Sequence, residues 1–508
     1  MSTSEEISRA EDVAVRRLPL IRGRAPRVVS LVYNDASRDS RVLKTTATLR
    51  AAGADARIVA SARDHLGHPA GVGMVGDLEV HRVADLSLVR MFPRLAAAWR
   101  SYRARGAAQA IPSAPQRADT DSDTHTAASS TPSTEEPTDI TAEGGMRHTG
   151  PGPTPAQASA PTQATLSAPA PARSGPVALA ADIWMRTYGT ARLASWWLGA
   201  VREARALRPD VVHSNDANAL VPALLTTVGT GGKVIYDSHE LWRHRNILRR
   251  NRWLAPYVEA AIESVGIRLS AGVITVSPSI AEWLRRTYAL PTLPTLVRNI
   301  PTSRGLPDPA QGRLRELAGL GAQDRVVSYV GGITTGRGLE ETVDALALLP
   351  ADTHLVLLGY GDQRYIDGLL ARAAAAGVGE RVHLAGAVPS AEVPQALADA
   401  DVAVVFVRPI CLSYEFSLPN KLFESIHAGL PIVAADLPDT AEVVRRYGVG
   451  QVFDATTPED LADAIRQVLA DPEAYREASR AAAAELTWEH EAGQLVDLYA
   501  RVLEGRRG

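Results

Sequence analysis

Short apolar runs that end in glycine or polar residues recur along this chain, and helix-like segments separate them. From Arg325 onward the runs are RVVSYVGG, THLVLLGYGD, RVHLAGAV, DVAVVFV and LPIVAAD. Runs that are apolar on both faces are typical of central strands in a parallel sheet covered by helices on both sides. The pattern therefore predicts an α/β fold, with a Rossmann-like domain in the second half of the chain.

The first half shows the same alternation. RVVSLVY at 27–33 predicts a strand, a helix is expected from Ser40 to Ala52, and ARIVAS predicts the next strand. Three further runs, DVVHSND, KVIYDSHE and AGVITVS, each end in polar residues. Ligands of open parallel sheets bind at the carboxyl ends of the strands. We therefore expect one crevice to be faced by His213, Asn215, Asp216, Asp237, His239, Glu240 and Ser277.

The length of 508 residues exceeds one ordinary domain and predicts at least two. We expect an N-terminal tail (1–25), an N-terminal domain in two parts (26–105 and 177–300), a C-terminal domain (301–485) and a C-terminal helix (486–508). Whether this helix returns to the N-terminal domain is left open. The segment from Pro294 to Leu314 is rich in proline and is expected to link the domains.

An insertion is expected at 106–176, where Ala, Pro, Ser, Thr and Gly dominate. Between Tyr102 and Trp184 the chain contains no aromatic Phe, Trp or Tyr residue. Such a segment buries too little apolar surface to offset the entropy of ordering it, so we predict disorder. The alternating Asp119, Asp121 and Asp123 within it are interpreted as solvating charge.

Composition narrows the function classes. The net charge of -3 gives no electrostatic reason to expect nucleic acid as a partner. The single cysteine, Cys411, excludes an internal disulfide and a cysteine-rich metal cluster. The N-terminal residues lack an apolar signal-peptide centre, and no apolar run approaches the ~20 residues of a membrane-spanning helix. We therefore expect a cytoplasmic protein.

Two segments that flank the insertion, 91–105 and 182–207, carry Trp, Leu and Arg at helical spacing. The favoured interpretation is that both are helices packed on the N-terminal domain. The alternative is a peripheral contact with the inner face of the membrane, in which arginines meet anionic lipid and tryptophans lie at the interface.

Glycine-rich ends of the C-terminal strands predict a binding site for a nucleotide. Gly331 and Gly332 open a loop that runs to Arg337 and precedes a helix, a combination that suits a phosphate or diphosphate. Gly359 ends the next strand. The turn with Gly386 and Val388 ends the strand that follows, and backbone groups of this turn can hold a planar base.

The segment 417–433, SLPNKLFESIHAGLPIV, contains the most informative cluster. Pro419 is placed to begin a helix that Asn420 or Ser417 could cap. Lys421 and the free amides of the first turn would face an anion. Glu424 lies one turn further along, where a carboxylate can accept two hydrogen bonds from a ribose diol.

In this order, the clusters resemble those of GT-B glycosyltransferases, in the large retaining family (family four) that uses nucleotide sugars. PNKLFESIHAGLPIVAAD resembles the family's carboxylate helix and the strand that follows it. YNDASRDSRVLKTTATLRAAGADARIVA resembles the family's first loop and helix, while DVVHSND and YDSHE resemble its strand ends. The similarity covers most of the chain apart from the tail and the insertion.

This resemblance implies a GT-B fold and a transfer reaction. The donor would be a UDP- or GDP-linked sugar, and the acceptor a hydroxyl of a glycan or lipid-linked molecule, with no metal and no other cofactor. Glu424 would hold the ribose, and Arg337 and Lys421 would stabilise the departing diphosphate. His213 or Asp216 would contact the sugar or the acceptor. Implied donor contacts are Gly331, Gly332, Gly359, Gly386, Val388, Asn420, Glu424 and Glu415, and acceptor contacts are Asn34, Asp35, Arg41, His239 and Glu240.

Three positions depart from the family pattern. The spacing E-x7-E would place the first glutamate at Phe416, and Glu415 lies one position away. Gly332 replaces a frequent arginine, and Asn34-Asp35 replace a glycine pair. These departures keep two alternatives open, a non-catalytic GT-B subunit that binds a nucleotide, glycan or partner, and a nucleotide-sugar epimerase.

Overall fold

The computed structural model describes residues 16–86, 176–246, 255–303, 305–454 and 457–505. The chain divides into one unit formed by Met1–Leu86 with Gly189–Gly508, and another formed by Ser87–Tyr188. Apart from Pro176, the predicted insertion, its three aspartates and the flank at 91–105 lie outside the described residues.

Within the described residues, the N-terminal half is built on an eight-stranded sheet of order β3-β4-β2-β1-β5-β6-β7-β8. Its neighbouring strands run parallel, except that β3 pairs antiparallel with β4. The carboxyl ends of β1, β5 and β6 are therefore adjacent. The strands are β1 Arg27–Leu31, β2 Asp55–Ser61, β3 Gly71–Val75, β4 Leu78–Val83, β5 Val211–Asn215, β6 Lys233–Ser238, β7 Gly272–Thr275 and β8 Thr295–Leu296.

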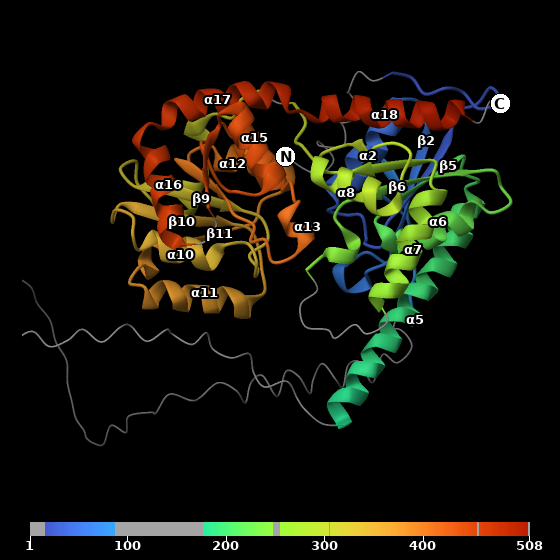
Figure 1. Cartoon of the computed structure of the whole chain (residues 1–508), viewed down its shortest axis with the longest axis horizontal. Helices are drawn as coiled ribbons and strands as arrows, with labels where there is room; N and C mark the ends of the chain where they lie inside the picture. The colour runs from blue at the N-terminus through green and yellow to red at the C-terminus, as the bar shows by residue number, and fades with distance from the viewer. Residues whose placement is uncertain (1–15, 87–175, 247–254, 304, 455–456, 506–508) are drawn as a thin grey trace, which may run out of the picture. The chain divides into compact units, whose positions relative to one another are not determined.

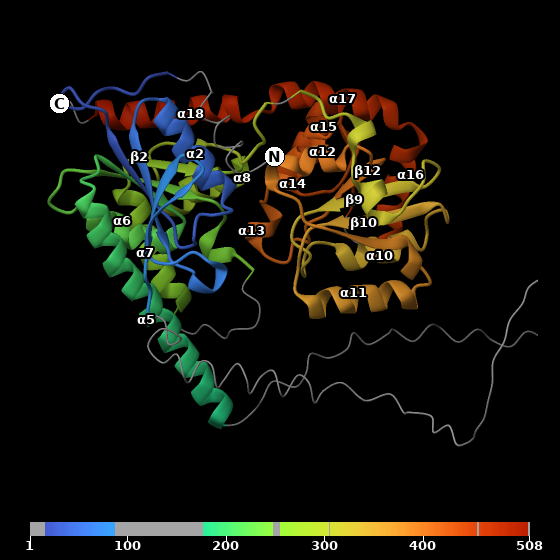
Figure 2. The same ribbon diagram turned by 180° about the vertical axis from the view of Figure 1, so that it is seen from behind.

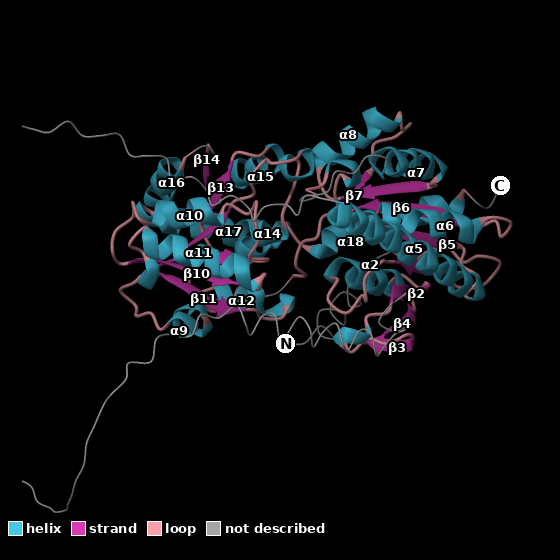
Figure 3. Cartoon of the chain, turned by 90° about the horizontal axis from the view of Figure 1, so that it is seen from below, coloured by secondary structure: helices cyan, strands magenta, loops and turns pink. Residues whose placement is uncertain are grey.

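Helices cover both faces of this sheet, as Figure 3 shows with strands in magenta and helices in cyan. Asp39 accepts a hydrogen bond from the Val42 amide and so caps α2, a helix that the sequence predicts almost to its bounds. Ser277 caps α8 in the same way. The helices are α2 Ser40–Ala51, α5 Pro176–Ala206, α6 Leu220–Thr227, α7 Ala255–Leu269 and α8 Pro278–Tyr288, with short 3-10 turns η1 Asp64–Leu66, η2 Ala217–Ala219 and η3 Trp242–His244.

The C-terminal half contains a six-stranded parallel sheet of order β11-β10-β9-β12-β13-β14 in the described residues. Five of the six strands coincide with the predicted apolar runs. Together the two sheets confirm the predicted pair of Rossmann-like halves. The strands are β9 Arg325–Val330, β10 Thr353–Leu358, β11 Val382–Gly386, β12 Val402–Val405, β13 Ile432–Ala435 and β14 Gly450–Phe453.

Two apolar clusters, one on each face of this second sheet, form its core. Figures 1 and 2 show its helices from opposite sides. They are α9 Leu314–Ala318, α10 Leu339–Leu346, α11 Gln363–Ala375, α12 Val393–Leu397, α13 Leu412–Glu415, α14 Asn420–His427, α15 Pro438–Tyr447, α16 Pro458–Ala470 and α17 Pro472–Glu485, with 3-10 turns η4 Pro309–Gln311, η5 Gly379–Arg381 and η6 Ser390–Glu392.

The last helix, α18 (Trp488–Glu504), belongs to the N-terminal core although it follows the C-terminal half in sequence. Its apolar residues, among them Leu495 and Tyr499, are buried in the same cluster as residues of β1 and α2. Trp488 donates an indole hydrogen bond of 3.0 Å to Thr48 Oγ1. The chain therefore crosses back, and both views place α18 beside α2.

Some elements differ from the sequence-based prediction. Strands β3, β4 and β14 were not predicted. GVGMV and GQVF are short, contain glycine and are mostly exposed or only partly buried, and LEVHRV of β4 contains three charged or polar residues. Thr295–Leu296, assigned to the linker, pair with β7 as the edge strand β8. The linker therefore begins later than expected, and the buried Val297 and Ile300 anchor its start.

The flank at 182–207 is helical, as predicted, and lies in α5. Trp196 is fully buried in a core cluster of the N-terminal half and donates a hydrogen bond of 3.3 Å to the Ala60 carbonyl. This finding supports packing on the N-terminal half for the part of the flank around Trp196. Within the described residues, no helix has both the length and the apolar character needed to cross a bilayer.

Candidate functional site

The carboxyl ends of β9, β10 and β11 bring the predicted glycines together. A Cβ atom on Gly359 would lie 1.9 Å from the Gly331 carbonyl oxygen, far inside van der Waals contact. The Gly359 amide donates to the Gly386 carbonyl at 2.5 Å. Gly331 has a φ of 120°, which side chains of L-residues rarely adopt. Glycine is therefore required here for the strand ends to approach one another. At Gly332, by contrast, an added Cβ would meet open space.

Lys421 lies in the first turn of α14 and points toward this glycine loop. A Cβ atom on Gly331 would lie 3.7 Å from the Lys421 Nζ. The ammonium lies 3.6 Å from the centroid of the Tyr329 ring. Lys421 is only 7% exposed, and its Nζ has no hydrogen-bond partner among the described residues. Because an anion bound beside this amine would favour its charged form, the side chain is placed to accept an anionic ligand.

Electrostatic effects place Arg337 and Glu424 around Lys421. Burial lowers the pKa of Lys421 well below its usual value, the charge of Arg337 lowers it further, and Glu424 acts in the opposite direction. The Arg337 guanidinium lies 4.8 Å from the centroid of the Tyr414 ring. The charges of Arg337 and Glu424 thus both act on Lys421.

The loop that carries Arg337 is held tightly before α10. Gly338, at the start of this helix, has a φ of 64°, and a Cβ there would lie 2.1 Å from the Phe406 ring. Thr335, in the same loop, has a buried Oγ1 without a hydrogen-bond partner among the described residues. The loop thus presents a cation and an unused hydroxyl from a fixed backbone.

The start of α14 differs from the prediction. Pro419 occupies the capping position, so the residue there has no side chain that accepts a hydrogen bond from the first-turn amides. Ser417 instead donates its hydroxyl to the Tyr414 carbonyl at 2.7 Å. Asn420 is exposed, and Glu424 lines a small cavity together with Lys44 and Ser390. The expected capping roles of Asn420 and Ser417 are therefore wrong, and Pro419 does not cap the amides.

Phe416, at the position of the family's first glutamate, packs against an apolar cluster of the N-terminal half. Its carbonyl accepts a hydrogen bond of 2.8 Å from Ser277 Oγ. Glu415 closes α13 and is partly buried. Val388, predicted to contact a base, is partly buried against a core cluster of the C-terminal half. The structure thus uses Phe416 for packing between the halves.

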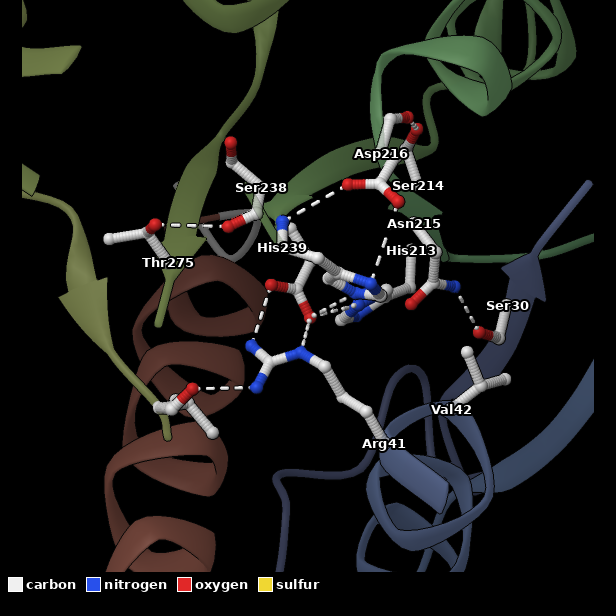
Figure 4. A network of polar contacts seen from close by, with 12 residues as sticks. Ser30, Arg41, Val42, His213, Ser214, Asn215, Asp216, Ser238, His239 and Thr275 are labelled. Carbon is white, nitrogen blue, oxygen red and sulfur yellow. Dashed lines mark hydrogen bonds and ion pairs between the residues drawn. The ribbon is translucent and has the colours of Figure 1, made fainter. Parts of the chain in front are cut away.

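A buried ionic network lies at the carboxyl ends of β5 and β6, and Figure 4 shows Arg41, His213 and His239 gathered in it. Asp237 contacts all three of these side chains. Arg41, from α2, donates to Asp237 Oδ2 and Oδ1 at 2.9 and 2.7 Å, and to the Val297 carbonyl at 2.6 Å. Burial alone would raise the pKa of Asp237, but the charges of Arg41 and His239 hold it well below its usual range. Asp237 is therefore an anion that orients the cations around it.

His213 and Asn215 do not face the crevice as predicted. His213 is fully buried, with Nδ1 2.7 Å from the Tyr499 hydroxyl and Nε2 3.2 Å from Asp237. Asn215 is buried and donates to Ser30 Oγ and to the Leu31 carbonyl. Both of them tie β5 to its neighbours, so the expected contact of His213 with sugar or acceptor is corrected.

His239 is partly exposed and lies between two carboxylates. Its Nε2 is 3.4 Å from Asp237 Oδ2 and its Nδ1 is 3.6 Å from Asp216 Oδ2. Burial alone would lower the pKa of His239, but the charges of Asp216 and Asp237 raise it to about 9. Asp216 has a φ of 60° and accepts a hydrogen bond from the His239 amide at 3.1 Å. His239 is therefore an imidazolium at neutral pH.

Glu240 turns toward α13 of the C-terminal half. Burial raises its pKa, the charge of Asp216 raises it further, and a hydrogen bond with the Ser413 side chain acts against both. Glu240 therefore lies beside the junction of the halves. Among the described residues, no group of His, Cys, Asp and Glu side chains is arranged to hold a metal ion.

A polar cavity of about 480 Å³ opens beside His239. Most of the predicted acceptor contacts line it, whereas Glu240 does not. Arg38, Asp39 and Asn299 were not predicted. Asn299 lies in the linker, far along the chain, and the resemblance of the loop at 34–39 to the family's first loop pointed only to Asn34 and Asp35. We call this the polar cavity; it is lined by Asn34, Asp35, Arg38, Asp39, Ser40, Arg41, His239, Val276, Asn299, Leu418 and Asn420.

Comparison with known proteins relates both halves to glycosyltransferases. Residues 161–300 match the family model described as Glycosyltransferase Family 4, and residues 324–471 match the one described as Glycosyl transferases group 1. The computed fold resembles sucrose-phosphate synthase from Thermosynechococcus elongatus, with a TM-score of 0.58 and 16% identity over 94% of this chain and 100% of that one. It also resembles Anabaena HepE in complex with UDP-glucose, with a TM-score of 0.56 and 14% identity over 94% of this chain and 98% of that chain. The predicted GT-B fold is thereby confirmed.

Curated relatives match parts of the chain. A GDP-mannose-dependent alpha-(1-6)-phosphatidylinositol monomannoside mannosyltransferase of Mycolicibacterium smegmatis is 28% identical over 43% of this chain and 58% of its own length. A glycogen synthase of Mycobacterium tuberculosis is 28% identical over 60% of this chain and 71% of its own length. The chain thus spans little more than half of that mannosyltransferase.

Proposed function

We propose that this chain is a glycosyltransferase that moves a hexose from a UDP- or GDP-linked donor to an acceptor hydroxyl, with retention and without a metal. The acceptor is a glycan or a lipid-linked glycan, and the reaction belongs to glycan or cell-envelope polysaccharide synthesis. The similar chains named above, among them a mannosyltransferase and a glycogen synthase, support a glycosyl transfer.

The observation that carries this proposal is the buried amine of Lys421, whose Nζ has no hydrogen-bond partner among the described residues. The charged form of an amine kept out of water is costly in the free protein, and the charge of Glu424 offsets this cost only in part, so the pKa of Lys421 stays well below its usual value. That cost is offset when an anion occupies the adjacent glycine loop. Arg337 adds a second positive charge, and the first-turn amides of α14, which Pro419 does not cap, add their partial charge.

Leaving-group stabilisation follows from this arrangement. As the bond between the anomeric carbon and the diphosphate oxygen breaks, negative charge develops on the diphosphate. Lys421 and Arg337 would lie close to the oxygens on which that charge develops, so they would stabilise the transition state more than the bound donor. Two fixed cations supply the compensation that a divalent metal supplies elsewhere. Turnover in excess EDTA is therefore expected to match turnover without it.

The acceptor hydroxyl would approach from the same face of the sugar as the leaving group. Its oxygen forms the new bond to the anomeric carbon, and its proton passes to a phosphate oxygen of the departing diphosphate. This route retains the anomeric configuration and needs no protein carboxylate as nucleophile. It is compatible with Phe416 at the family's first glutamate position. The polar cavity, beside the loop at 34–39, would place the acceptor.

Substitution of Lys421 tests the proposal. Lys421→Ala should lower transfer from a UDP- or GDP-hexose by tens to thousands of fold, since one anion-stabilising donor contributes about 3 kcal/mol to a transition state. Lys233→Ala, at the start of β6 and remote from the glycine loop in sequence and sheet, is the matched control and should retain full turnover. Equal turnover in both variants would rule out the assigned role.

One observation favours a second candidate, a non-catalytic subunit that binds a nucleotide or a glycan. Phe416 packs between the halves where the family pattern places a glutamate. Such a subunit would bind a nucleoside diphosphate and release no product. Tight nucleotide binding without sugar release or transfer, over a broad acceptor panel, would identify it.

A further inference from the structure

We infer that the polar cavity takes a neutral, polyhydroxylated ring as acceptor, a saccharide or cyclitol whose bound part carries no phosphate or carboxylate. The inference rests on the proposed function and names the acceptor class of that site. It is argued from the charges that line the cavity and from the hydrogen bonds that these groups already make.

Arg41, a cation that lines the cavity, already makes hydrogen bonds within the protein. Three guanidinium nitrogens of Arg41 donate within the protein, two to Asp237 and one to the Val297 carbonyl, at 2.6 to 2.9 Å. Arg41 and Asp237 are 5% and 1% exposed at their side chains. An arginine binds phosphate through the same donors. Three of the five N–H donors of Arg41 are therefore committed, and its charge is paired with the buried Asp237, so Arg41 offers little net positive charge to an anionic acceptor.

His239, the second cation, is neutralised by its neighbours. Its two ring nitrogens face Asp216 and Asp237 at 3.6 and 3.4 Å. A phosphate that approached the His239 imidazolium would also come close to the carboxylates of Asp216 and Asp237. At low local dielectric such like-charge repulsion is strong.

Among the other charged residues that line the cavity, carboxylates outnumber cations. Arg38 is exposed, and two carboxylates, Asp35 and Asp39, lie within the same loop. The cavity thus contains one cation that is not already paired, together with two anions. A bound phosphate would gain little from Arg38 and would be repelled by Asp35 and Asp39.

The loop at 34–39 is preorganised to bind hydroxyl groups. The Asn34 side chain donates to Asp39 at 2.8 Å and accepts from the Ala36 amide at 2.8 Å. Ala36 has a φ of 60°, a strained value for a residue other than glycine. Asp35 accepts both of its hydrogen bonds, from the Ser37 amide and hydroxyl, at Oδ1. Its Oδ2 therefore remains for a ligand.

An unused acceptor lies on the other wall. Asn299 donates to Ser40 Oγ at 3.2 Å, but its buried Oδ1 has no hydrogen-bond partner among the described residues. A carboxylate oxygen and an amide oxygen both accept hydrogen bonds from hydroxyls and offer nothing to a phosphate oxygen. Fixed acceptors on two sides of a cavity are the pattern expected for a sugar or cyclitol ring.

The test compares acceptors in matched pairs. The wild-type chain is given UDP-hexoses and GDP-hexoses with neutral acceptors and their phosphates: glucose and glucose 6-phosphate, mannose and mannose 6-phosphate, and myo-inositol and its 3-phosphate, with maltose and mannobiose as longer neutral acceptors. Products are measured by mass spectrometry. We expect kcat/KM for the neutral member to exceed that for the phosphate at least tenfold. Preference for the phosphorylated members, or no transfer to any neutral acceptor while a nucleotide binds, would overturn the inference.

Variants of Asp35 test whether this residue determines the preference for neutral acceptors. Asp35→Asn should raise the KM for the neutral acceptor at least tenfold, and Asp35→Lys should narrow the gap between the neutral and phosphorylated members. Asp463→Asn, on the exposed surface of α16, is the control and should change neither. Nucleotide binding, followed by calorimetry, reports on the donor site separately. If the wild-type protein binds no nucleotide, the proposed function itself is contradicted. If it binds a nucleotide but both Asp35 variants keep the acceptor selectivity of the wild type, only this inference is contradicted.

Discussion

Asp237 shows how one buried carboxylate can set the charge of a whole site. It contacts Arg41, His213 and His239, each contributed by a different element. With Asp237 held as an anion, Arg41 is fixed in place and His239 stays protonated. The same contacts that stabilise the fold therefore determine which groups remain available to a ligand.

The pH dependence of stability tests the state of His239. Its pKa is raised to about 9 in the fold, from about 6.5 in the unfolded chain. Its contribution is therefore complete below about pH 6.5 and is lost as the pH rises through 9. Between pH 6 and pH 9.5, the free energy of unfolding of the wild type should fall by roughly 1–3 kcal/mol more than that of His239→Gln.

Urea unfolding at the two pH values measures this difference. His490→Gln, an exposed histidine of α18, is the control and should follow the wild type. Parallel losses of stability in wild type and His239→Gln would mean that His239 is not held as an imidazolium by Asp216 and Asp237.

At the scale of elements, the close approach of two strand ends builds the donor loop. Gly359→Ala would force a Cβ to within 1.9 Å of the Gly331 carbonyl, so β10 would have to move away from β9. We expect a loss of at least about 2 kcal/mol in unfolding free energy, together with weaker nucleotide binding. Gly368→Ala is the matched control, because an added Cβ in α11 meets nothing within 4 Å.

The control substitution, Gly368→Ala, should change the free energy of unfolding in the opposite direction. Alanine in the interior of an exposed helix is favoured over glycine, so Gly368→Ala should stabilise the protein by about 0.5–1 kcal/mol. Thermal and urea unfolding of the two variants give the comparison. A neutral Gly359→Ala substitution would show that the β9 and β10 ends are looser than described.

Most elements of the C-terminal half could be predicted, because each buried strand there is a run of apolar residues between turn signals. The bounds of α2 were predicted to within about a residue by its apolar spacing and by the glycine after it, whereas α18 is shorter at both ends than the expected 486–508. Strand β14 escaped prediction because its four residues, GQVF, include a glycine and a glutamine. Thr295–Leu296 escaped because prolines on both sides favour a linker.

The site was predictable only in part. Lys421, Glu424 and Arg337 belong to local motifs, so their meeting follows from the topology of one sheet. The burial of His213 depends on Tyr499, which is brought in by α18 from the far end of the chain. Asn299 joins the polar cavity from the linker. No local pattern encodes contacts of that range, so sequence reasoning placed His213 at the surface of the crevice.

At the scale of the larger unit, α18 makes the N-terminal half depend on the last helix of the chain. Trp488 is fully buried against α2 and hydrogen bonded to Thr48. Trp488→Ala should therefore destabilise the N-terminal half by about 3–5 kcal/mol, the usual cost of such a cavity. Tyr257→Ala, in α7 and 75% exposed, is expected to stay within about 0.5 kcal/mol of the wild type.

Hydrogen exchange of the whole chain distinguishes a local from a global effect. In Trp488→Ala, the amides of β1 and α2 should lose protection before those of β9 and β10. If both halves lost protection together, the two sheets would unfold as one cooperative unit.

Binding of a nucleoside and of its diphosphate tests the central claim most directly. Calorimetry of uridine against UDP, and of guanosine against GDP, isolates what the diphosphate contributes. We predict that in the wild type the diphosphate of the cognate base tightens binding at least 100-fold, about 2.7 kcal/mol, and that the ratio falls below tenfold in the double variant Arg337→Ala/Lys421→Ala. An unchanged ratio in the double variant, or no gain from the diphosphate in the wild type, would contradict the claim that these two cations receive the leaving group.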